Sequence, residues 1–377
     1  MKPPDRAPQN PSSLKLSPGL AAFKGLEQDL WRAIDLCREH GNYARPSMNV
    51  GTFCAQSHVL VVAGKGGVGK TTMTAALARM AADAGNSVLI VELEGKSGIT
   101  AAFGRREDLG YEEVLLAPAA LGAGGAMTGP VRARRLTPDD ALMEYLEDHG
   151  LRRVSKRLAH SGVLDVVSTA IPGIRDVLVL GKVKQLEREA LADLILVDAP
   201  ATGHAITFLT SASGLVSAAR GGPLRTQAQD VVDLLSDPAR CRVILVTLPE
   251  ELPVSETIES AYTLEDRAGV QLGPVIVNAC DPEPVGLERP AAEMAAAGGG
   301  ADRVPPGHLA ALEEARRFRL ARHAVSSDQV ERLGRELPLP RLLVPALDAA
   351  TIGSAETAQL ADALAGAVTG LVAEGAR

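Results

Sequence analysis

A glycine-rich stretch, GKGGVGKTT at residues 64–72, carries the residue types that hold phosphate. Glycines let backbone N–H groups approach an anion closely, and a helix that begins directly after them adds the positive end of its dipole. Lys70 would bridge the β and γ phosphates of a nucleotide, and the Thr71 hydroxyl would ligate Mg²⁺. A second lysine, Lys65, lies inside the loop, where the phosphate-loop pattern does not require one.

The same stretch also fits the dinucleotide pattern G-x-G-x-x-G, so it has two interpretations. Glu92 and Glu94 close the next expected strand, where a nicotinamide-binding fold places the carboxylate that binds ribose. Against this, Lys70 and Thr71 directly follow the last glycine. Asp198 ends a later buried run, as the Mg²⁺-binding acid of a phosphate-loop enzyme does. We therefore favour a phosphate loop and keep a dehydrogenase as the weakest alternative.

Short, almost unbroken apolar runs alternate with helical segments along the chain, which predicts an α/β fold. We expect a doubly wound, mainly parallel sheet with helices on both faces. The interval from about residue 100 to 190 shows no strand of comparable strength and is expected to be a helical insertion, with LTPDDALMEYLEDHGL and LGKVKQLEREALA as its clearest helices. Residues 282–305, rich in Ala, Gly and Pro, are expected to be a flexible surface insertion. The expected strands are 58–63, 87–93, 193–199, 242–248 and 273–279, with a further one near 341–346.

The N-terminal region differs in composition from the rest of the chain. Residues 1–50 are expected to be an extension that is partly disordered, with one helix over residues 19–40. Met48 is a candidate natural start, so residues 1–47 are either the product of a mis-assigned start or a genuine docking helix. The remaining expected parts are a phosphate-loop domain at 51–350, which includes the helical subdomain at about 100–190, and a C-terminal helix of the same domain at 351–377.

Composition limits the partners and the location of the protein. A net charge of -7 over 377 residues argues against a general nucleic-acid binder, so we expect no nucleic-acid partner. No apolar run approaches the roughly 20 residues of a membrane span. The four cysteines, Cys37, Cys54, Cys241 and Cys280, include no C-x-x-C pair and give no zinc clip or disulfide framework. We expect a cytoplasmic protein, with peripheral membrane association left open.

Three further segments carry a family resemblance. DAPATGHAITFL from Asp198, VTLPEELPVSET from Val246 and IPGIRDVL from Ile171 are similar, in order and spacing, to signatures of the arsenical-pump and tail-anchored-protein-targeting ATPases. VELEGKSGITAAFG and RDVLVLGKVKQ resemble the actinobacterial anion-transporting-ATPase-like branch, whose members often occur as adjacent paralogous pairs. The resemblance covers residues 58–346. It implies a P-loop NTPase fold with a deviant phosphate loop, and ATP hydrolysis with Mg²⁺ by a dimer that closes on nucleotide.

The resemblance also implies roles for single residues. Lys65 would reach the nucleotide of the partner subunit and neutralise charge during phosphoryl transfer, whereas a solvated loop lysine is the alternative. Glu94 stands where the family carries an aspartate that positions water. Asn278 would read the adenine. The expected set is Lys65, Lys70, Glu94 and Asp198 for catalysis, Gly64, Gly66, Gly67, Val68, Gly69, Lys70, Thr71, Thr72 and Asn278 for ATP, and Thr71 and Asp198 for Mg²⁺.

Other features keep two interpretations each. Gly203 and His204 resemble a switch that senses the γ phosphate, and a structural role for His204 is equally open. Residues 220–236 are either a mobile element that couples nucleotide state to cargo or a packed surface helix. A group of basic residues is either a surface for an anionic partner or, as we favour, a solvated helix face. This group comprises Arg132, Arg134, Arg135, Arg152, Arg153, Lys156 and Arg157.

Two functions follow from the sequence. The first is a Mg²⁺-dependent ATPase, a homodimer or a heterodimer with a paralogue, whose nucleotide state is coupled to a protein or membrane-protein cargo. The second is an ATP-binding scaffold or the weakly active half of a paralogue heterodimer, because Glu94 is one methylene longer than the aspartate that it replaces. Arsenite and tail-anchored-protein roles are not supported, because neither grouped cysteines nor a methionine-rich groove is found.

Overall fold

The computed structural model describes residues 48–93, 98–122, 125–148, 173–297 and 305–374. All of them lie in one compact unit, Ser47–Arg377. The expected extension over residues 1–47, Glu94 and the basic residues between 152 and 157 fall outside the described residues. The domain boundaries proposed from the sequence therefore stay predictions.

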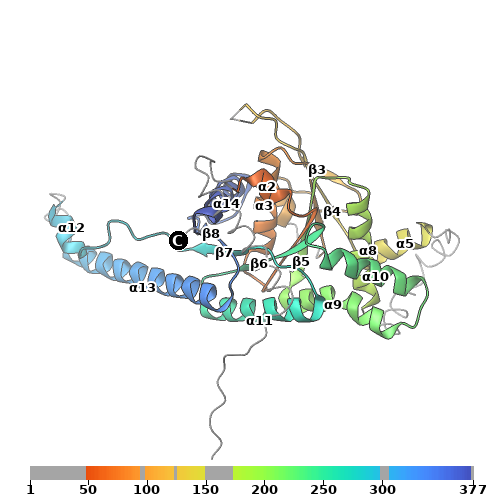
Figure 1. Cartoon of the computed structure of the whole chain (residues 1–377). Coiled ribbons are helices and arrows are strands. Elements are labelled where there is room, and N and C mark those ends of the chain that lie inside the picture. Colours follow the sequence, from red (N-terminus) through yellow and green to blue (C-terminus); the bar gives the residue numbers. More distant parts are fainter. Residues whose placement is uncertain (1–47, 94–97, 123–124, 149–172, 298–304, 375–377) are drawn as a thin grey trace, which may run out of the picture. The chain divides into compact units, whose positions relative to one another are not determined.

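The described residues form an eight-stranded sheet in the order β3-β4-β2-β5-β1-β6-β7-β8 (Figure 1). Neighbouring strands run parallel except β3 and β4, which are antiparallel at one edge. This is the mainly parallel α/β sheet that the sequence predicts. The strands are β1 (Val59–Gly64), β2 (Val88–Glu92), β3 (Val114–Ala117), β4 (Val131–Arg135), β5 (Leu194–Ala201), β6 (Cys241–Thr247), β7 (Val275–Cys280) and β8 (Arg341–Pro345).

Helices cover both faces of the sheet (Figure 1). One face carries α2 (Val50–Cys54), α3 (Lys70–Asp83), α4 (Gly98–Ala102) and α14 (Ser354–Glu374). The other carries α5 (Pro138–Asp148), α8 (Ile174–Arg188), α9 (Thr202–Ala218), α10 (Pro223–Ser236) and α11 (Glu251–Ala268). Between β7 and β8 the chain forms α12 (Ala291–Ala297) and α13 (Pro306–Glu336). In the part of the chain that the structure describes, no helix combines the length and apolarity that crossing a membrane requires.

Strand residues alternate between the two cores. In β1, Val59 and Val61 pack into the core on one face, whereas Leu60 and Val62 pack into the core on the other. Every residue of this strand is buried, so both faces need apolar side chains, which explains the unbroken apolar run in the sequence. Parallel strands end at the same edge of a sheet. The residues that follow β1, β2, β5 and β7 therefore meet there.

The interval from about residue 100 to 190, expected to be a helical insertion with no strand of comparable strength, is only partly helical. It contains β3 and β4, which add two strands to one edge of the sheet. In β4, VRARR, Val131 and Ala133 are buried, whereas arginines occupy the positions between and after them. The arginines conceal the strand from a search for apolar runs. The two helical segments predicted in this interval are confirmed as α5 and α8.

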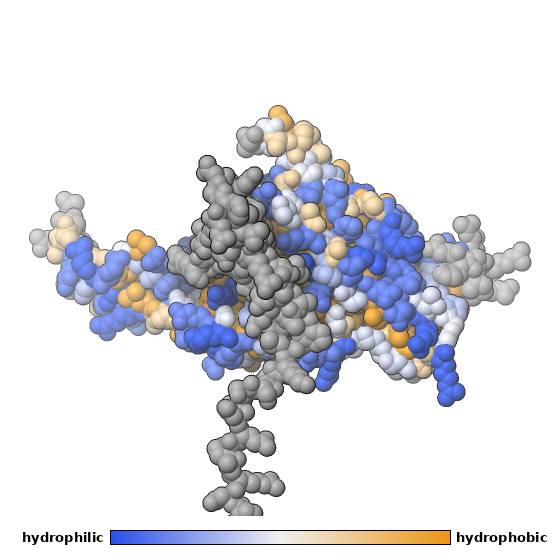
Figure 2. Space-filling model, viewed as in Figure 1, coloured by the Kyte–Doolittle hydropathy of each residue, from blue (hydrophilic) through white to orange (hydrophobic). Residues whose placement is uncertain are grey.

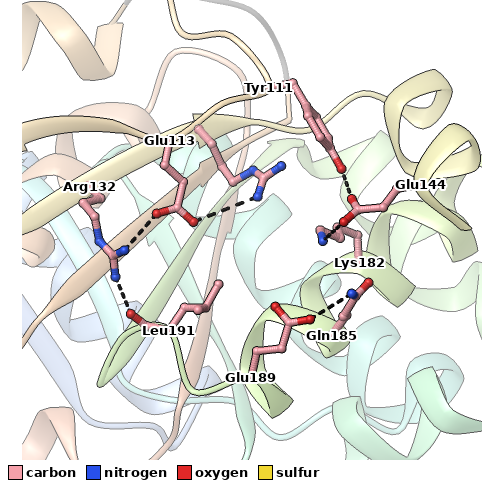
Figure 3. A network of polar contacts seen from close by, with 9 residues as sticks. Tyr111, Glu113, Arg132, Glu144, Lys182, Gln185, Glu189 and Leu191 are labelled. Carbon is pink, nitrogen blue, oxygen red and sulfur yellow. Dashed lines mark hydrogen bonds and ion pairs between the residues drawn. The ribbon is translucent and has the colours of Figure 1, made fainter. Parts of the chain in front are cut away.

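The interpretation of the basic group as a solvated helix face is wrong for its described members. Arg132, Arg134 and Arg135 lie on β4, not on a helix. Arg132 donates to Glu113 and to the carbonyl of Leu191 (Figure 3). The guanidinium of Arg134 is buried and lies 4.3 Å from the centre of a tyrosine ring. These arginines are held by contacts within the chain, with carboxylates, a carbonyl oxygen or an aromatic ring.

The same polar network connects the sheet edge to two helices. Tyr111 donates to Glu144 of α5, which also accepts from Lys182 of α8 (Figure 3). α12 lies inside residues 282–305, which were expected to be a flexible surface insertion. α10 lies inside residues 220–236, for which two interpretations were left open. α10 buries Ala228, Val231, Leu234 and Leu235, as a packed helix does.

Candidate functional site

The glycine loop joins β1 to α3, which begins at Lys70. Gly67 and Gly69 have φ angles of 89° and 91°, in the left-handed region that only glycine adopts without strain. A Cβ atom on Gly64 would lie 2.3 Å from the carbonyl oxygen of Val246. A Cβ atom on Gly67 would meet no atom within 4 Å. Glycine is therefore required where the loop backbone is left-handed or closely packed, and the space next to Gly67 is open.

The helix after the loop meets the carboxylate at the end of β5. Thr71 Oγ1 donates to Asp198 Oδ2 over 2.7 Å, and Thr74 Oγ1 donates to Oδ1 over 3.2 Å. Asp198 is only 7% exposed. The parallel pairing of β1 with β5 brings these distant residues together. Sequence reasoning missed Thr74, although its position three residues after Thr71 places both hydroxyls on one side of the helix.

These residues fit a nucleotide with its metal ion. A hydroxyl and a carboxylate that face each other provide the oxygen ligands that Mg²⁺ prefers. Lys70 Nζ donates to the carbonyl oxygen of Lys65 over 3.3 Å, so its ammonium lies over the loop. The open space above Gly67 lies on the same loop. Phosphate and Mg²⁺ would thus find matching groups here.

The second loop lysine has a partner within its own chain. Lys65 Nζ lies 2.6 Å from Glu256 Oε1 of α11. The side chains are 34% and 36% exposed, so this ion pair lies at the surface. Glu256 was not predicted as a site residue, although it belongs to the segment VTLPEELPVSET that carries part of the family resemblance. The simple interpretation of Lys65 as a solvated loop lysine therefore omits a specific ion pair.

Asn278 supports the loop from the side. It lies near the end of β7, and its Nδ2 donates to the carbonyl oxygen of Val68 over 2.9 Å. A Cβ atom on Gly69 would lie 2.4 Å from the same nitrogen, so this glycine also makes room for the asparagine. The structure thus gives Asn278 a contact with the loop, and its expected contact with adenine stays a prediction. Thr72 is half-buried in the first turn of α3.

The two glutamates at the end of β2 differ in what the structure describes. Glu94 lies outside the described residues, so its role in positioning water stays a prediction. Glu92 is 1% exposed, lies 3.2 Å from Arg135 Nε, and is the register partner of Asp198 between β2 and β5. A carboxylate buried in an ion pair is not presented to a ribose at the sheet edge. Glu92 therefore weighs against the dinucleotide interpretation.

Gly203 and His204 are exposed in the first turn of α9. Asp176 lies in the first turn of α8. Burial raises the pKa of the Asp176 carboxyl, and the nearby His204 and Arg175 counteract part of that rise. His204 thus has a structural neighbour, and its role in sensing the γ phosphate stays a prediction. Asp176 belongs to IPGIRDVL, the third segment of the family resemblance.

The described cysteines are separate free thiols. Burial raises the pKa of Cys54 and of Cys241 to about 12 and that of Cys280 to about 11. Such thiols remain protonated at neutral pH and are poor nucleophiles and metal ligands.

Comparisons with known proteins agree with the family resemblance that the sequence predicts. Residues 57–218, which include the glycine loop, Asp198 and His204, match the family model described as anion-transporting ATPase. The chain is 39% identical over 227 residues to ATPase BagA of Mycobacterium tuberculosis, an alignment that covers 58% of this chain and 64% of that protein. The family resemblance predicted from the sequence, including the actinobacterial branch, is thereby confirmed.

Two less similar relatives carry other names. An arsenical pump-driving ATPase of Escherichia coli is 26% identical over 278 residues, which is 73% of this chain and 40% of that protein. ATPase get3 of Schizosaccharomyces japonicus is 29% identical over 178 residues, which is 45% of this chain and 50% of that protein. The matched region spans less than two thirds of the length of each of these three relatives.

Proposed function

We propose, from the premise that residues 57–218 belong to the anion-transporting ATPase family, that this chain binds ATP with Mg²⁺ and hydrolyses it. The contact between Thr71 Oγ1 and Asp198 Oδ2, 2.7 Å long, is the observation that carries the proposal. It joins the first turn after the glycine loop to the end of the neighbouring parallel strand. Phosphate-loop NTPases hold Mg²⁺ from these two positions.

In this proposal the loop residues bind the phosphates through their backbone. Gly66, Gly67, Val68 and Gly69 direct N–H groups toward the anion, and the dipole of α3 favours it. Lys70 contacts the β and γ phosphates, and Thr72 contacts the α phosphate. Mg²⁺ held by Thr71 and Asp198 would neutralise charge on the transferring group.

The proposed active form is a dimer in which Lys65 crosses to the nucleotide of the partner subunit. Support comes from the position of Lys65, which is partly exposed and held by a single surface carboxylate, Glu256. A relative is named for driving an arsenical pump, and we propose that this chain likewise couples its nucleotide state to a protein or membrane-protein cargo. The partner subunit is a second copy or a paralogue, and the proposed location is the cytoplasm.

Glu94 favours a second candidate function, in which ATP is bound but scarcely hydrolysed. Glu94 replaces the aspartate that would position the attacking water, and its side chain is longer by one methylene. If that change prevents hydrolysis, the chain is an ATP-binding scaffold or the weakly active half of a heterodimer with a paralogue.

Phosphate release by the purified chain, alone and mixed with its paralogue, tests the proposal. Turnover that disappears when a chelator removes Mg²⁺, or with Asp198→Asn, supports the ATPase. ATP binding without turnover in either mixture supports the scaffold. Binding of a nicotinamide cofactor without binding of ATP would overturn both in favour of a dehydrogenase.

A further inference from the structure

The helix α13 is 31 residues long, and its buried residues lie in its C-terminal part. Gln329 and Leu333 are buried there, and Arg332 donates to Ser255 of α11. Further upstream, Phe318 is 62% exposed and Val325 is 57% exposed. Figure 2 shows orange, apolar surface among blue along this helix, at the left of the view. An apolar helix surface of this kind is a candidate for contact with another molecule.

Part of the exposed surface of α13 forms a continuous stripe that contains Phe318 and Val325. Positions 311, 315, 318, 322 and 325 alternate in steps of four and three, the spacing that keeps side chains on one stripe of a helix. Two contacts of α13 with the preceding segment lie on a different side of the helix: Glu313 accepts from Ala291 N, and Arg316 donates to the carbonyl of Leu287. Arg322, which lies on the same side as Phe318, contacts Asp281. We define the α13 stripe as the exposed residues Ala311, Glu314, Ala315, Phe318, Ala321, Arg322 and Val325.

The α13 stripe is complementary to itself in the antiparallel direction. A second stripe related by a two-fold axis at Phe318 places Ala311 opposite Val325, Ala315 opposite Ala321, and Glu314 opposite Arg322. Each pair then occurs twice, as in every two-fold interface. The alanines allow the two helices to approach closely, and two pairs of opposite charge flank the central phenylalanines. A parallel arrangement would instead bring each charge next to its own copy, which is unfavourable.

We propose that the α13 stripe binds the α13 stripe of a second copy of this chain, antiparallel, with Phe318 on the axis. Arg322 Nε donates to Asp281 Oδ2 over 3.1 Å, which holds the guanidinium in place on the helix. A guanidinium has five N–H donors and binds a second carboxylate through the others. The contact uses a different element from the glycine loop. It is therefore distinct from the nucleotide-gated dimer and does not depend on the proposed ATPase activity.

The size of the contact sets its expected strength. One pair of helices buries less than the ~800 Å² per partner of a standard interface, so association through the stripe is weak. We expect concentration-dependent dimers of the nucleotide-free full chain in sedimentation equilibrium. Phe318→Asp abolishes them. Leu312→Asp is the matched control: Leu312 is also 52% exposed on α13, but its side chain points about 120° away from Phe318. Loss of dimers with Leu312→Asp as well as with Phe318→Asp would overturn the proposed stripe.

Charge reversal tests the register. Glu314→Arg or Arg322→Glu alone weakens the dimer by about tenfold or more, because like charges then face each other. The double variant restores it, because each pair again has opposite charges. Because Arg322→Glu also removes the contact with Asp281, circular dichroism must show that each variant is folded. If Arg322→Glu is not folded, Glu314→Arg alone tests the pair. A double variant that is folded but does not recover dimerisation would overturn the antiparallel register.

A cross-link gives a second measurement. Phe318→Cys should form a symmetric disulfide-linked dimer on mild oxidation, because the two sulfur atoms meet at the axis, whereas Leu312→Cys and the unchanged chain should not. Equal cross-linking of the two cysteine variants would contradict the proposal. A chain that stays monomeric but binds its paralogue or anionic lipid vesicles through Phe318 would overturn it in favour of that partner.

Discussion

Lys65 Nζ lies 2.6 Å from Glu256 Oε1, so the second loop lysine is ion-paired within its own subunit. Both side chains are about one third exposed, and such surface pairs stabilise a protein by only about 0–1 kcal/mol. A weak pair suits a lysine that has to leave its partner. In the proposed dimer, the phosphates of the neighbouring nucleotide compete with this single carboxylate for Lys65. Glu256 thus restrains the lysine in the separate subunit.

Replacement of Lys65 tests its action across the interface. Lys65→Ala should bind ATP with unchanged affinity, because Lys70 and the loop backbone remain. Its dimer-dependent turnover should fall by about 10²-fold or more, as when a charge that stabilises the transition state is removed. Equilibrium nucleotide binding and phosphate release measure the two effects. Unchanged turnover would remove the cross-subunit role.

Replacement of Glu256 tests the restraint on the lysine. Glu256→Gln removes the charge that holds Lys65, so ATP-dependent dimerisation should become tighter by a factor of about 2–5, the range set by a surface ion pair. Glu259→Gln is the matched control, because Glu259 is an exposed carboxylate further along the same helix. Light scattering with and without ATP measures the change. Weaker dimerisation of Glu256→Gln would mean that the pair assists closure instead of opposing it.

The threonine–aspartate contact predicts different effects for its two donors. Asp198→Asn should lower turnover by about 10²–10³-fold and weaken the response to Mg²⁺, because the carboxylate is the proposed metal ligand. Thr71→Val should act in the same way. Thr74→Val loses the 3.2 Å bond to Asp198 and the 3.0 Å bond to the carbonyl oxygen of Lys70, but no proposed metal ligand, so it should lower turnover by less than about tenfold. A Thr74 variant as impaired as the Thr71 variant would move the metal site toward Thr74.

Which strands were predictable depends on where each lies in the sheet. β1 and β5 are flanked by strands and helices on all sides, so their sequences are continuous apolar runs. β4 lies near the edge, and its alternate positions hold arginines that contact Glu113 and Glu92, so its pattern resembles a polar surface segment. Hydrophobicity alone does not distinguish such a strand from a helix face.

The candidate site likewise contains residues that the sequence predicts and contacts that it does not. Lys70 and Thr71 were predictable because they directly follow the glycine loop at the start of a helix. Asp198 was predictable because it lies near the end of a buried strand, and parallel strands end at the same edge of the sheet. The partners of Lys65 and Val68 were not predictable, because they depend on how α11 and β7 pack beside the loop. No local pattern encodes a contact between Lys65 and a residue 191 positions away. Glu256 lies in a segment that carries the family resemblance, but it was not predicted as a site residue.

The contact of Asn278 with the loop predicts its effect on nucleotide choice. Its Nδ2 donates to Val68 O over 2.9 Å, so Asn278→Ala should loosen the phosphate loop and weaken ATP and GTP binding by a similar factor, about 3–10-fold. Asn278→Asp should be worse, because a carboxylate would face the same carbonyl oxygen. Competition binding with the two nucleotides measures this. A loss confined to ATP would instead support the expected contact with adenine.

A separate ion pair, at the amino-terminal ends of the central strands, makes the stability of the fold depend on pH. Glu187, near the end of α8, accepts two hydrogen bonds from Arg240, over 3.0 and 2.6 Å, and lies 3.5 Å from His58 Nδ1. The hydrogen bonds from Arg240 outweigh burial and hold the pKa of the Glu187 carboxyl below its ordinary value of 4.5. The folded protein therefore favours the ionised carboxylate more than the unfolded chain does.

Glu187→Gln should reveal that preference. Because the folded pKa is depressed, the carboxylate stabilises the fold fully above the unfolded value of 4.5, and the contribution is lost as the pH falls through the folded value. We expect the variant to be less stable by about 1–2 kcal/mol at neutral pH, and the difference to shrink below 4.5. Urea unfolding across this range measures it, with the exposed Glu189→Gln on the same helix end as control. A difference that stays constant down to strongly acidic pH would show that Glu187 acts through packing and not through its charge.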